Sequence, residues 1–208
     1  MKLILASTSP RRQEILTLLC LPFEVFAPEF VETPSIHRSI EAEVLAFAVG
    51  KAHSIATHHP ESIVIGSDTM ICLDGEKMGK PSDSEEAKRM LCALSGKTHR
   101  LYTAVALIDG CGGPGLQIVE EVLVQMRRSS ATEIESYLNC NESLDKAGAY
   151  SIQGRGAELI ESIHGDYLAA VGMPLRPIAD YLTSRGISFP LDIDQLYTNK
   201  PVFNWRRF

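Results

Sequence analysis

The chain contains few of the residues that mark secreted, metal-binding or membrane-spanning proteins. Its five cysteines are scattered and none belongs to a Cys-x-x-Cys pair, so we expect reduced thiols in a reducing, cytoplasmic compartment. The six histidines show no His-Glu-x-x-His spacing and no cluster with cysteine, which excludes the common zinc motifs. No apolar run has the length of a membrane span, and a strand pattern starts at Lys2, so we expect neither a membrane helix nor a signal peptide.

Positive charge is also scarce. The formal net charge of −6 argues against a nucleic-acid coat protein and against a membrane-surface protein, but it is compatible with a local basic pocket for a small anion. With 208 residues, of which 45% are hydrophobic, the chain has ample material for a core. The length fits one large α/β domain or two small lobes.

The first thirteen residues carry the clearest local signal. An apolar run of strand length ends at Ala6, three hydroxyl residues follow, and Pro10 suits the first position of a helix with Ser9 as its N-cap. The free backbone N–H groups of such a helix start attract anions, phosphate above all. Arg11 and Arg12 add two guanidinium groups to the same turn. The pattern favours a phosphate-bearing ligand, and the alternative is a capped helix with two solvated arginines.

The rest of the chain predicts a mixed α/β fold. Asp74-Gly75 indicates a hairpin turn, and two capping boxes, Ser82 to Glu85 and Ser130 to Glu133, each open a helix. Strands are expected at 22–28, 62–73 (with a polar interruption), 98–108, 116–126 and 158–163, and the other helices at 40–57 and 174–185, with a loop at 29–39. Because strands and helices do not alternate strictly, we expect a partly antiparallel sheet flanked by helices.

Three charged residues stand out as candidates for chemistry. Asp68 lies inside an apolar strand, where a carboxylate is costly unless a cation or a metal pairs with it, and Gly66 next to it permits close backbone approach. Lys51 falls on the apolar stripe of its helix, and Lys80 follows the hairpin that returns toward Asp68. The alternatives are an aspartate satisfied by nearby N–H groups, a lysine at the helix edge, and a turn lysine.

Two further segments bear on nucleotide binding. Ser95-Gly-Lys-Thr98 is similar to the end of a P-loop, but Leu91 stands where that motif needs glycine, and the run lies between a helix and a strand, so we reject a P-loop ATPase. Gln153 lies in a polar, glycine-bearing loop, where its amide can hydrogen-bond a base edge unless the loop is only a connector. Any metal here should be Mg²⁺ or Mn²⁺ on carboxylates and phosphates.

Taken together, several segments in order resemble the Maf family of nucleotide pyrophosphatases. The matching segments are Ala6-Ser-Thr-Ser-Pro-Arg-Arg12, Gly66-Ser-Asp-Thr69, Gly79-Lys-Pro81, Leu94-Ser-Gly-Lys-Thr-His99, Asp145-Lys-Ala-Gly-Ala-Tyr150 with Ile152-Gln-Gly154, and Val171-Gly-Met-Pro-Leu175. The resemblance implies a fold like that of the inosine triphosphate pyrophosphatases, with an elongated mixed sheet and a central cleft between two lobes. It places the family domain at 1–186 and leaves 187–208 as an extension of unknown role.

The resemblance also implies an activity, a cofactor and an assembly. We expect hydrolysis of a nucleoside triphosphate to monophosphate and pyrophosphate, with Mg²⁺ or Mn²⁺ as cofactor, by a homodimer in the cytoplasm. The residues Lys80, Gln153 and the arginine pair after Pro10 look like the branch that acts on dTTP, UTP and related pyrimidine nucleotides. The branch associated with 7-methyl-GTP has different residues in the loop around Gln153.

Family roles carried over by position divide the site into three groups. Glu32 and Asp68 form the essential acidic pair that would hold metal or activate water, and which acid does which is left open. The triphosphate would be gripped by Ser7, Arg12, Lys51 and Lys80. Base or sugar would be recognised by Arg11, Thr69 and Gln153. This division agrees with phosphoryl chemistry, which needs neutralised phosphate oxygens and an oriented water.

The sequence departs from the family pattern at two positions. Val31 stands where relatives often have a further acid, which weakens any metal scheme that needs three carboxylates there. The residue before Val171 is Ala170, where some relatives have asparagine, so base selectivity is expected to shift.

Two other classes of protein compete with the hydrolase. A nucleotide-binding regulator of cell division would bind without turnover, but it would not need both Glu32 and Asp68. A nucleotidyltransferase usually opens with a glycine-rich turn, which Ala6-Ser-Thr-Ser9 lacks, and it consumes a second substrate.

Overall fold

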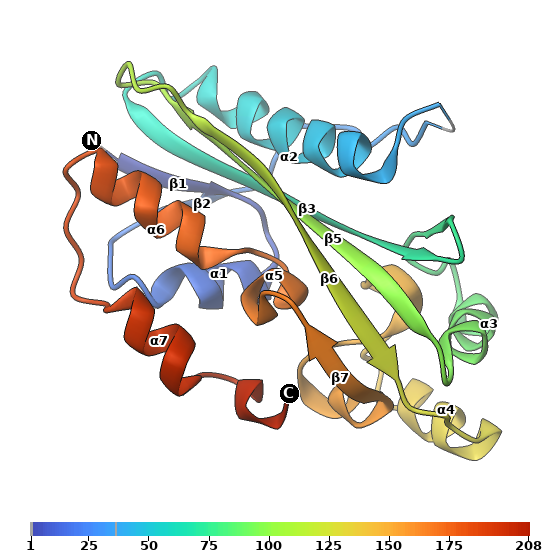
Figure 1. Ribbon diagram of the computed structural model, residues 1–208. Coiled ribbons are helices and arrows are strands. Elements are labelled where there is room, and N and C mark those ends of the chain that lie inside the picture. Colours follow the sequence, from blue (N-terminus) through green and yellow to red (C-terminus); the bar gives the residue numbers. More distant parts are fainter. Residues whose placement is uncertain (1, 36) are drawn as a thin grey trace.

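The computed structural model describes residues 2–35 and 37–208, and its backbone is organised around one seven-stranded mixed sheet (Figure 1). The strand order is β2-β1-β3-β5-β6-β7, and β4 pairs with the far end of β3. Strands β1 and β2 run parallel to each other, β1 runs parallel to β3, and all remaining pairs are antiparallel. The expected mixed α/β class is therefore confirmed.

The strands are β1 (Lys2–Ala6), β2 (Glu24–Phe26), β3 (Ser62–Leu73), β4 (Glu76–Met78), β5 (Thr98–Asp109), β6 (Leu116–Met126) and β7 (Ile160–His164). The helices are α1 (Pro10–Thr17), α2 (Ile40–Ala56), α3 (Ser84–Leu94), α4 (Ala131–Leu138), α5 (Tyr167–Val171), α6 (Leu175–Ser184) and α7 (Ile193–Asn199). Within the described ranges, no helix is long and apolar enough to cross a bilayer.

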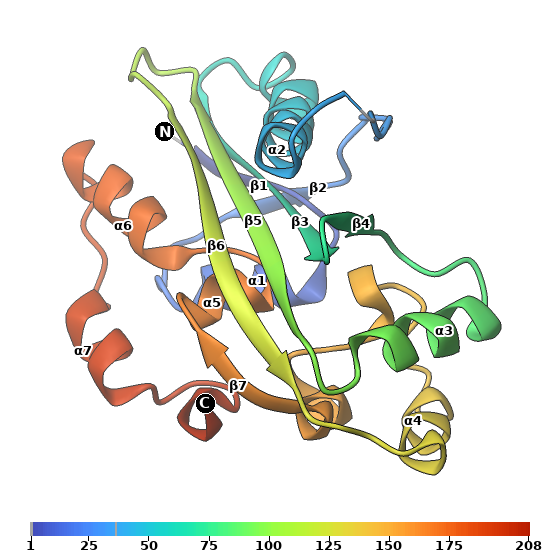
Figure 2. The ribbon, with the colours of Figure 1, turned by 45° about the vertical axis from the view of Figure 1, so that its right-hand side comes forward.

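Helices cover both faces of the sheet, and strand alternation decides which residues each face receives. Helix α2 lies on one face, where Val44 and Ala48 pack with Ala104 and Ala106 of β5. Helices α1, α5 and α6 lie on the other face, over a larger core that includes odd-numbered residues of β3 such as Ile65. Figure 2 shows the two layers on opposite sides of the long strands β3, β5 and β6.

Several local predictions are confirmed by these elements. Strand β1, the hairpin at Asp74-Gly75 and the antiparallel pair β5–β6 form as expected, and α2 begins at the predicted residue. The capping box at α4 is complete, with Ser130 and Glu133 each accepting a backbone N–H of the other. The loop predicted at 29–39 includes residue 36, which lies outside the described residues, as does residue 1 of the predicted domain.

Other local predictions are wrong. The cap of α3 is Asp83 rather than Ser82, because the helix starts one residue later and the Asp83 carboxylate accepts the N–H of Glu86. Ser9 occupies the N-cap position of α1, but its side chain makes no capping hydrogen bond. The predicted strand at 62–73, by contrast, is confirmed, and β3 continues through its polar residues without a break.

The remaining differences lie at strand ends and in the tail. Strand β2 spans three residues rather than seven, because Pro22 and Pro28 have no N–H to donate to a ladder. Strand β7 starts at Ile160, after a 3₁₀ segment at Gly154–Leu159. Helices α5 and α7 were not predicted. The tail that carries α7, whose role the sequence left open, packs onto the core through Leu196 and Trp205.

Candidate active site

A cleft with a volume of about 810 Å³ opens where β1 ends and the ladder on that side of β3 is interrupted. Strand β1 pairs with β3 as far as Ile65, and β4 pairs with it from Ile71 onward. Between these residues β3 has β5 as its only neighbour within the described part of the sheet. Asp68 lies in the middle of this opening, close to the start of α1. Strand ends beside helix starts are common ligand sites in α/β sheets.

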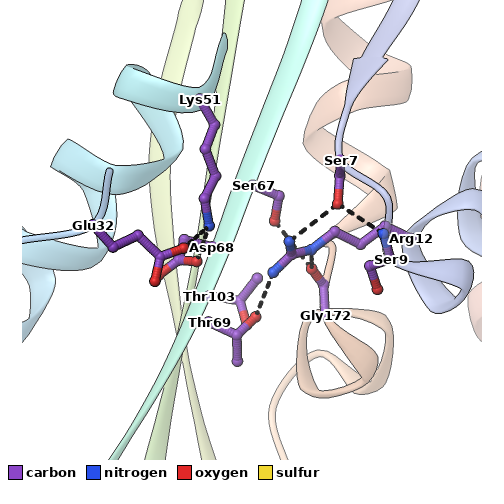
Figure 3. Close-up of polar contacts among 10 residues, drawn as sticks. All are labelled: Ser7, Ser9, Arg12, Glu32, Lys51, Ser67, Asp68, Thr69, Thr103 and Gly172. Carbon is purple, nitrogen blue, oxygen red and sulfur yellow. Dashed lines mark hydrogen bonds and ion pairs between the residues drawn. The ribbon is translucent and has the colours of Figure 1, made fainter. Parts of the chain in front are cut away.

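One face of β3 carries an acidic cluster around a lysine. Lys51 Nζ of α2 lies 2.5 Å from Asp68 Oδ1 and 2.6 Å from Glu32 Oε1 (Figure 3). Lys51 and Asp68 are 8% and 7% exposed, whereas the Glu32 side chain is 42% exposed to the cleft. The second oxygen of each carboxylate has no hydrogen-bond partner among the described residues, so both carboxylates retain acceptor sites on the cleft side.

A glycine sets the distance between Lys51 and Asp68. A Cβ built on Gly66 would lie 2.2 Å from the carbonyl oxygen of Ala48 and 2.7 Å from the amide nitrogen of Ala52. Helix α2 therefore contacts the bare backbone of β3 at this residue. Because Lys51 follows Ala48 by three residues and Asp68 follows Gly66 by two, the same contact brings the two charged side chains together.

Glu32 comes from a loop, and a second buried acid anchors that loop. Glu43 on α2 is 1% exposed and accepts the N–H of Ser35 at 2.7 Å. Lys77 Nζ of β4 lies 3.1 Å from the same carboxylate and donates to the carbonyl oxygens of Ser35 and Arg38. This pair, which the sequence analysis did not identify, fixes the loop on the C-terminal side of Glu32.

On the other face of β3 lies Arg12 of α1, whose guanidinium is held by neutral oxygens. Its guanidinium donates to the Gly172 carbonyl at 2.9 Å, to Ser7 Oγ at 3.3 Å and to Thr69 Oγ1 at 3.4 Å (Figure 3). Each of these acceptors also has a second partner. The Gly172 carbonyl accepts the hydroxyl of Ser67, and Ser7 Oγ accepts the N–H of Ser9. Thr69 Oγ1 shares a hydrogen bond with Thr103 Oγ1. No carboxylate lies within ion-pair distance of Arg12 among the described residues.

The two faces shift the pKa values of their groups differently. Burial alone would raise the pKa of Glu32, but the hydrogen bond and charge of Lys51, with the charges of Lys80 and Arg12, bring it below its ordinary value. Burial is also the main influence on Arg12 and lowers its pKa, while the charge of Asp68 acts in the opposite direction. Glu32 is therefore ionised at neutral pH, and Arg12 is a poorly solvated cation.

The structure brings most of the predicted site residues to this cleft. Its lining includes Ser7, Arg11, Arg12, Glu32, Lys51, Asp68, Thr69 and Lys80. Arg11 Nη1 lies 3.7 Å from an Asp145 carboxylate oxygen at the cleft edge. Gln153 is not among the lining residues, although its neighbours Ser151 and Ile152 are. The contact of Gln153 with a base or sugar therefore stays a prediction.

Some residues of the site carry no clear sequence signal. Thr103 on β5 lies opposite Thr69 and donates to the Ala169 carbonyl at 2.8 Å, a contact that becomes visible only once the strand register is known. His99 lies below the cleft wall, with Nε2 2.7 Å from the hydroxyl of the lining residue Tyr150. Burial lowers the pKa of His99 to about 4, so the ring is neutral at neutral pH and supports the wall without adding charge.

The acidic cluster has the donor chemistry that Mg²⁺ and Mn²⁺ prefer. These ions bind oxygen ligands and commonly take only one or two carboxylates, completing their shell with water and substrate phosphates. Glu32 and Asp68 supply two carboxylates that meet at Lys51 Nζ, and each retains a second oxygen on the cleft side. No group of three or more His, Cys, Asp or Glu residues in ranges 2–35 and 37–208 is arranged to hold an ion by itself. The two carboxylates therefore fit a metal ion whose remaining ligands are water and the phosphates of a substrate.

Fold and site together define a mixed α/β protein with an anion-binding cleft beside a pair of carboxylates. A family model described as "Maf-like protein" matches residues 2–185, and the chain belongs to this family. The expected family membership is thus confirmed. The match covers all of the structure up to the end of α6 and leaves out the tail.

Similar proteins carry the name dTTP/UTP pyrophosphatase. One from Symbiobacterium thermophilum is 45% identical over 186 residues, which cover 89% of this chain and 94% of that protein. One from Bacillus cytotoxicus is 45% identical over 174 residues, covering 84% of this chain and 90% of that protein. One from Myxococcus xanthus is 43% identical over 188 residues, covering 90% and 94%.

Proposed function

We propose that this protein hydrolyses nucleoside triphosphates, dTTP and UTP foremost, to the monophosphate and pyrophosphate. The observation that carries the proposal is the pairing of two unlike groups in one cleft. Arg12 is a partly buried cation with no contacting carboxylate among the described residues, and Glu32 and Asp68 are two carboxylates on the opposite face of the same strand. The names of relatives at 43–45% identity support the choice of reaction and of nucleotide.

In this proposal the cationic side chains bind the triphosphate. Arg12 and Lys80, with the Ser7 hydroxyl, would hold the phosphate oxygens at the end of β1, where the N–H groups at the start of α1 add to the positive potential. Arg11, Thr69 and Gln153 would contact the base or sugar. Electrostatic stabilisation of the charge that develops on phosphate oxygens is the main requirement of phosphoryl transfer.

The acidic pair would supply the water. One carboxylate of Glu32 and Asp68 accepts a proton from a water molecule, whose oxygen then bonds to phosphorus. The anhydride bond between the α- and β-phosphates breaks, and its oxygen leaves as part of pyrophosphate. Lys51 lies between the acids, holds both in place and lowers the pKa of Glu32. Mg²⁺ or Mn²⁺, held by Glu32 and Asp68, would neutralise phosphate charge when bound.

Two further properties belong to the proposal. We place the enzyme in the cytoplasm, which is supported by five cysteines that are all free thiols. We also propose a homodimer, supported by the family resemblance. Sedimentation velocity tests the assembly, because a dimer has twice the 22.9 kDa mass of the chain and therefore sediments faster than a monomer.

The test is pyrophosphate release from dTTP, UTP, CTP, 5-methyl-UTP, pseudo-UTP and 7-methyl-GTP, with Mg²⁺ and with Mn²⁺. Release from pyrimidine nucleotides with monophosphate as the other product is expected. Release from 7-methyl-GTP alone would keep the reaction and overturn the choice of base. Binding without product would point to a regulator, and consumption of a second substrate would point to a nucleotidyltransferase.

A further inference from the structure

The tail beyond α6 lies outside the match to the family model, yet it contacts the wall of the cleft. Trp205 is 5% exposed and stacks on Tyr167, the first residue of α5, with ring centroids 5.2 Å apart. Tyr197 of α7 packs edge-on against Trp205 at 5.0 Å. In Figures 1 and 2 the tail, drawn in red, runs beside α5 and β7 and ends next to them.

The first connection from the tail to the cleft runs through Asn204. Its Nδ2 donates to the backbone carbonyl of Ile152 at 3.0 Å, and its Oδ1 accepts the hydroxyl of Tyr167. Ile152 and the preceding Ser151 line the cleft, and Gln153 follows directly. The wall segment 151–153 is irregular backbone, and its other hydrogen bonds run from the Ser151 N–H to the Tyr137 hydroxyl and from the Gln153 N–H to Ser151 Oγ. One side chain of the tail thus ties this segment to α5.

The second connection runs through the start of α5. The Tyr197 hydroxyl donates to Asp166 Oδ2 at 2.8 Å, and Asp166 caps α5 by accepting the N–H groups of Leu168 and Ala169 through its other oxygen. Helix α5 ends at Val171, and the carbonyl of the next residue, Gly172, accepts Arg12. The tail is therefore bonded to both elements that form this wall.

We propose that residues 197–205 form a brace that positions the cleft wall, with Asn204 as the positioning residue for segment 151–153. Asn204 does not touch the substrate. It fixes the Ile152 carbonyl, and through it the wall that faces the base end of the nucleotide, whereas the phosphate end depends on Arg12 and its neighbours. The assignment of the base end rests on the proposed function, but the bracing itself does not.

The test compares three full-length variants. Asn204→Ala removes both side-chain bonds, and Tyr167→Phe removes only the bond between Tyr167 and Asn204. Asp192→Ala removes the N-cap of α7, which accepts the N–H of Gln195, and so weakens the tail without touching the wall. Calorimetry measures binding of a non-hydrolysable α,β-methylene analogue of UTP and of pyrophosphate. Hydrogen exchange follows the amides of residues 151–156.

We expect Asn204→Ala to weaken binding of the UTP analogue about three- to tenfold, which corresponds to the one hydrogen bond that holds the Ile152 carbonyl, while pyrophosphate binding stays unchanged. Amides at 151–156 should exchange faster than in Asp192→Ala at matched thermal stability, and Tyr167→Phe should show the smaller effect. Unchanged analogue binding and exchange in Asn204→Ala would overturn the brace. Failure of the proposed function is distinguishable, because it appears as no pyrophosphate release from the unaltered protein.

Discussion

Lys51 and Arg12 approach β3 from opposite faces, and the two cations are held in different ways. Lys51 lies between two carboxylates, so the cluster of three groups has a net charge of −1. In the part of the chain that the structure describes, the Arg12 guanidinium contacts a carbonyl and two hydroxyl oxygens and no carboxylate, so its full charge remains. Strand alternation produces this difference, because Asp68 points to one face while Ser67 and Thr69 point to the other.

The difference indicates what each cation is for. A partly buried charge that is held by neutral dipoles costs free energy in the unliganded protein, and binding of an anion offsets that cost. A lysine between two acids is already neutralised, and its effect is to hold those acids close together and to lower the pKa of Glu32. The cleft thus combines an anion-binding half and an acidic half, separated by one strand.

The largest expected effect comes from removing the acids. Asp68→Asn and Glu32→Gln should each lower kcat by about 10²–10⁴-fold, since each keeps its shape but loses the ability to accept a proton. Pyrophosphate release measures the loss, and circular dichroism confirms that the fold is kept. Asp74→Asn, at the exposed hairpin turn, is the matched control. Turnover like that of the unaltered protein in either variant would remove that acid from the site.

Removing Lys51 should cost stability as well as activity. In Lys51→Met the two acids lose their common partner, and we expect a loss of about 2–3 kcal/mol, less than for a fully buried pair because Glu32 is partly exposed. The folded pKa of Glu32 lies below its ordinary value of 4.5, so its stabilising contribution is present above pH 4.5 and is lost as pH falls through the folded value. The difference in Tm between the unaltered protein and Lys51→Met should therefore become smaller below about pH 4. A gap that widens on acidification would contradict this role.

Removing Arg12 should weaken substrate binding without lowering thermal stability. Each acceptor of Arg12 keeps a second partner, so Arg12→Met leaves no oxygen without a hydrogen bond. We expect unchanged or higher thermal stability. The KM for the triphosphate should rise roughly ten- to hundredfold, because a charged hydrogen bond to the substrate is lost. Thermal unfolding and steady-state kinetics on one preparation test both parts. A large loss of stability would show that the arginine is a structural residue.

The smallest effect is expected from the hydroxyl behind Arg12. Ser67→Ala removes one of the two donors to the Gly172 carbonyl but leaves Arg12 in contact with it. The KM for the triphosphate should rise at most about fivefold, with a loss of about 1 kcal/mol in stability. An effect as large as that of Arg12→Met would mean that the neutral oxygens bind the substrate directly.

The local parts of this site were predictable, and the non-local parts were not. Asp68 and Lys51 stand out because charge is costly in an apolar strand or stripe, and Arg12 because it follows a helix start. Thr103 looks like any strand residue, and only the β3–β5 register places it behind Thr69. Gln153 was selected from a loop pattern and a resemblance, and neither specifies which way a loop side chain points.

The tail escaped prediction for a related reason. Segment 187–208 has no hydrophobic period, because α7 has only seven residues and is held by aromatic stacking and by contacts with distant backbone rather than by an amphipathic stripe. Such short helices depend on tertiary contacts. Sequence reasoning correctly separated this segment from the family pattern, but it did not show that the segment completes the core.

The single tryptophan of the chain gives this arrangement an optical signature. Trp205 is buried against Tyr167, so its indole emits from an apolar environment while the tail is docked. Undocking would expose the indole to water and shift its emission to longer wavelength, without any added label. Tryptophan fluorescence, excited at a wavelength that tyrosine does not absorb, therefore reports on the tail, and far-UV circular dichroism reports on the whole fold. Comparing the two signals during heating separates detachment of the tail from unfolding of the sheet.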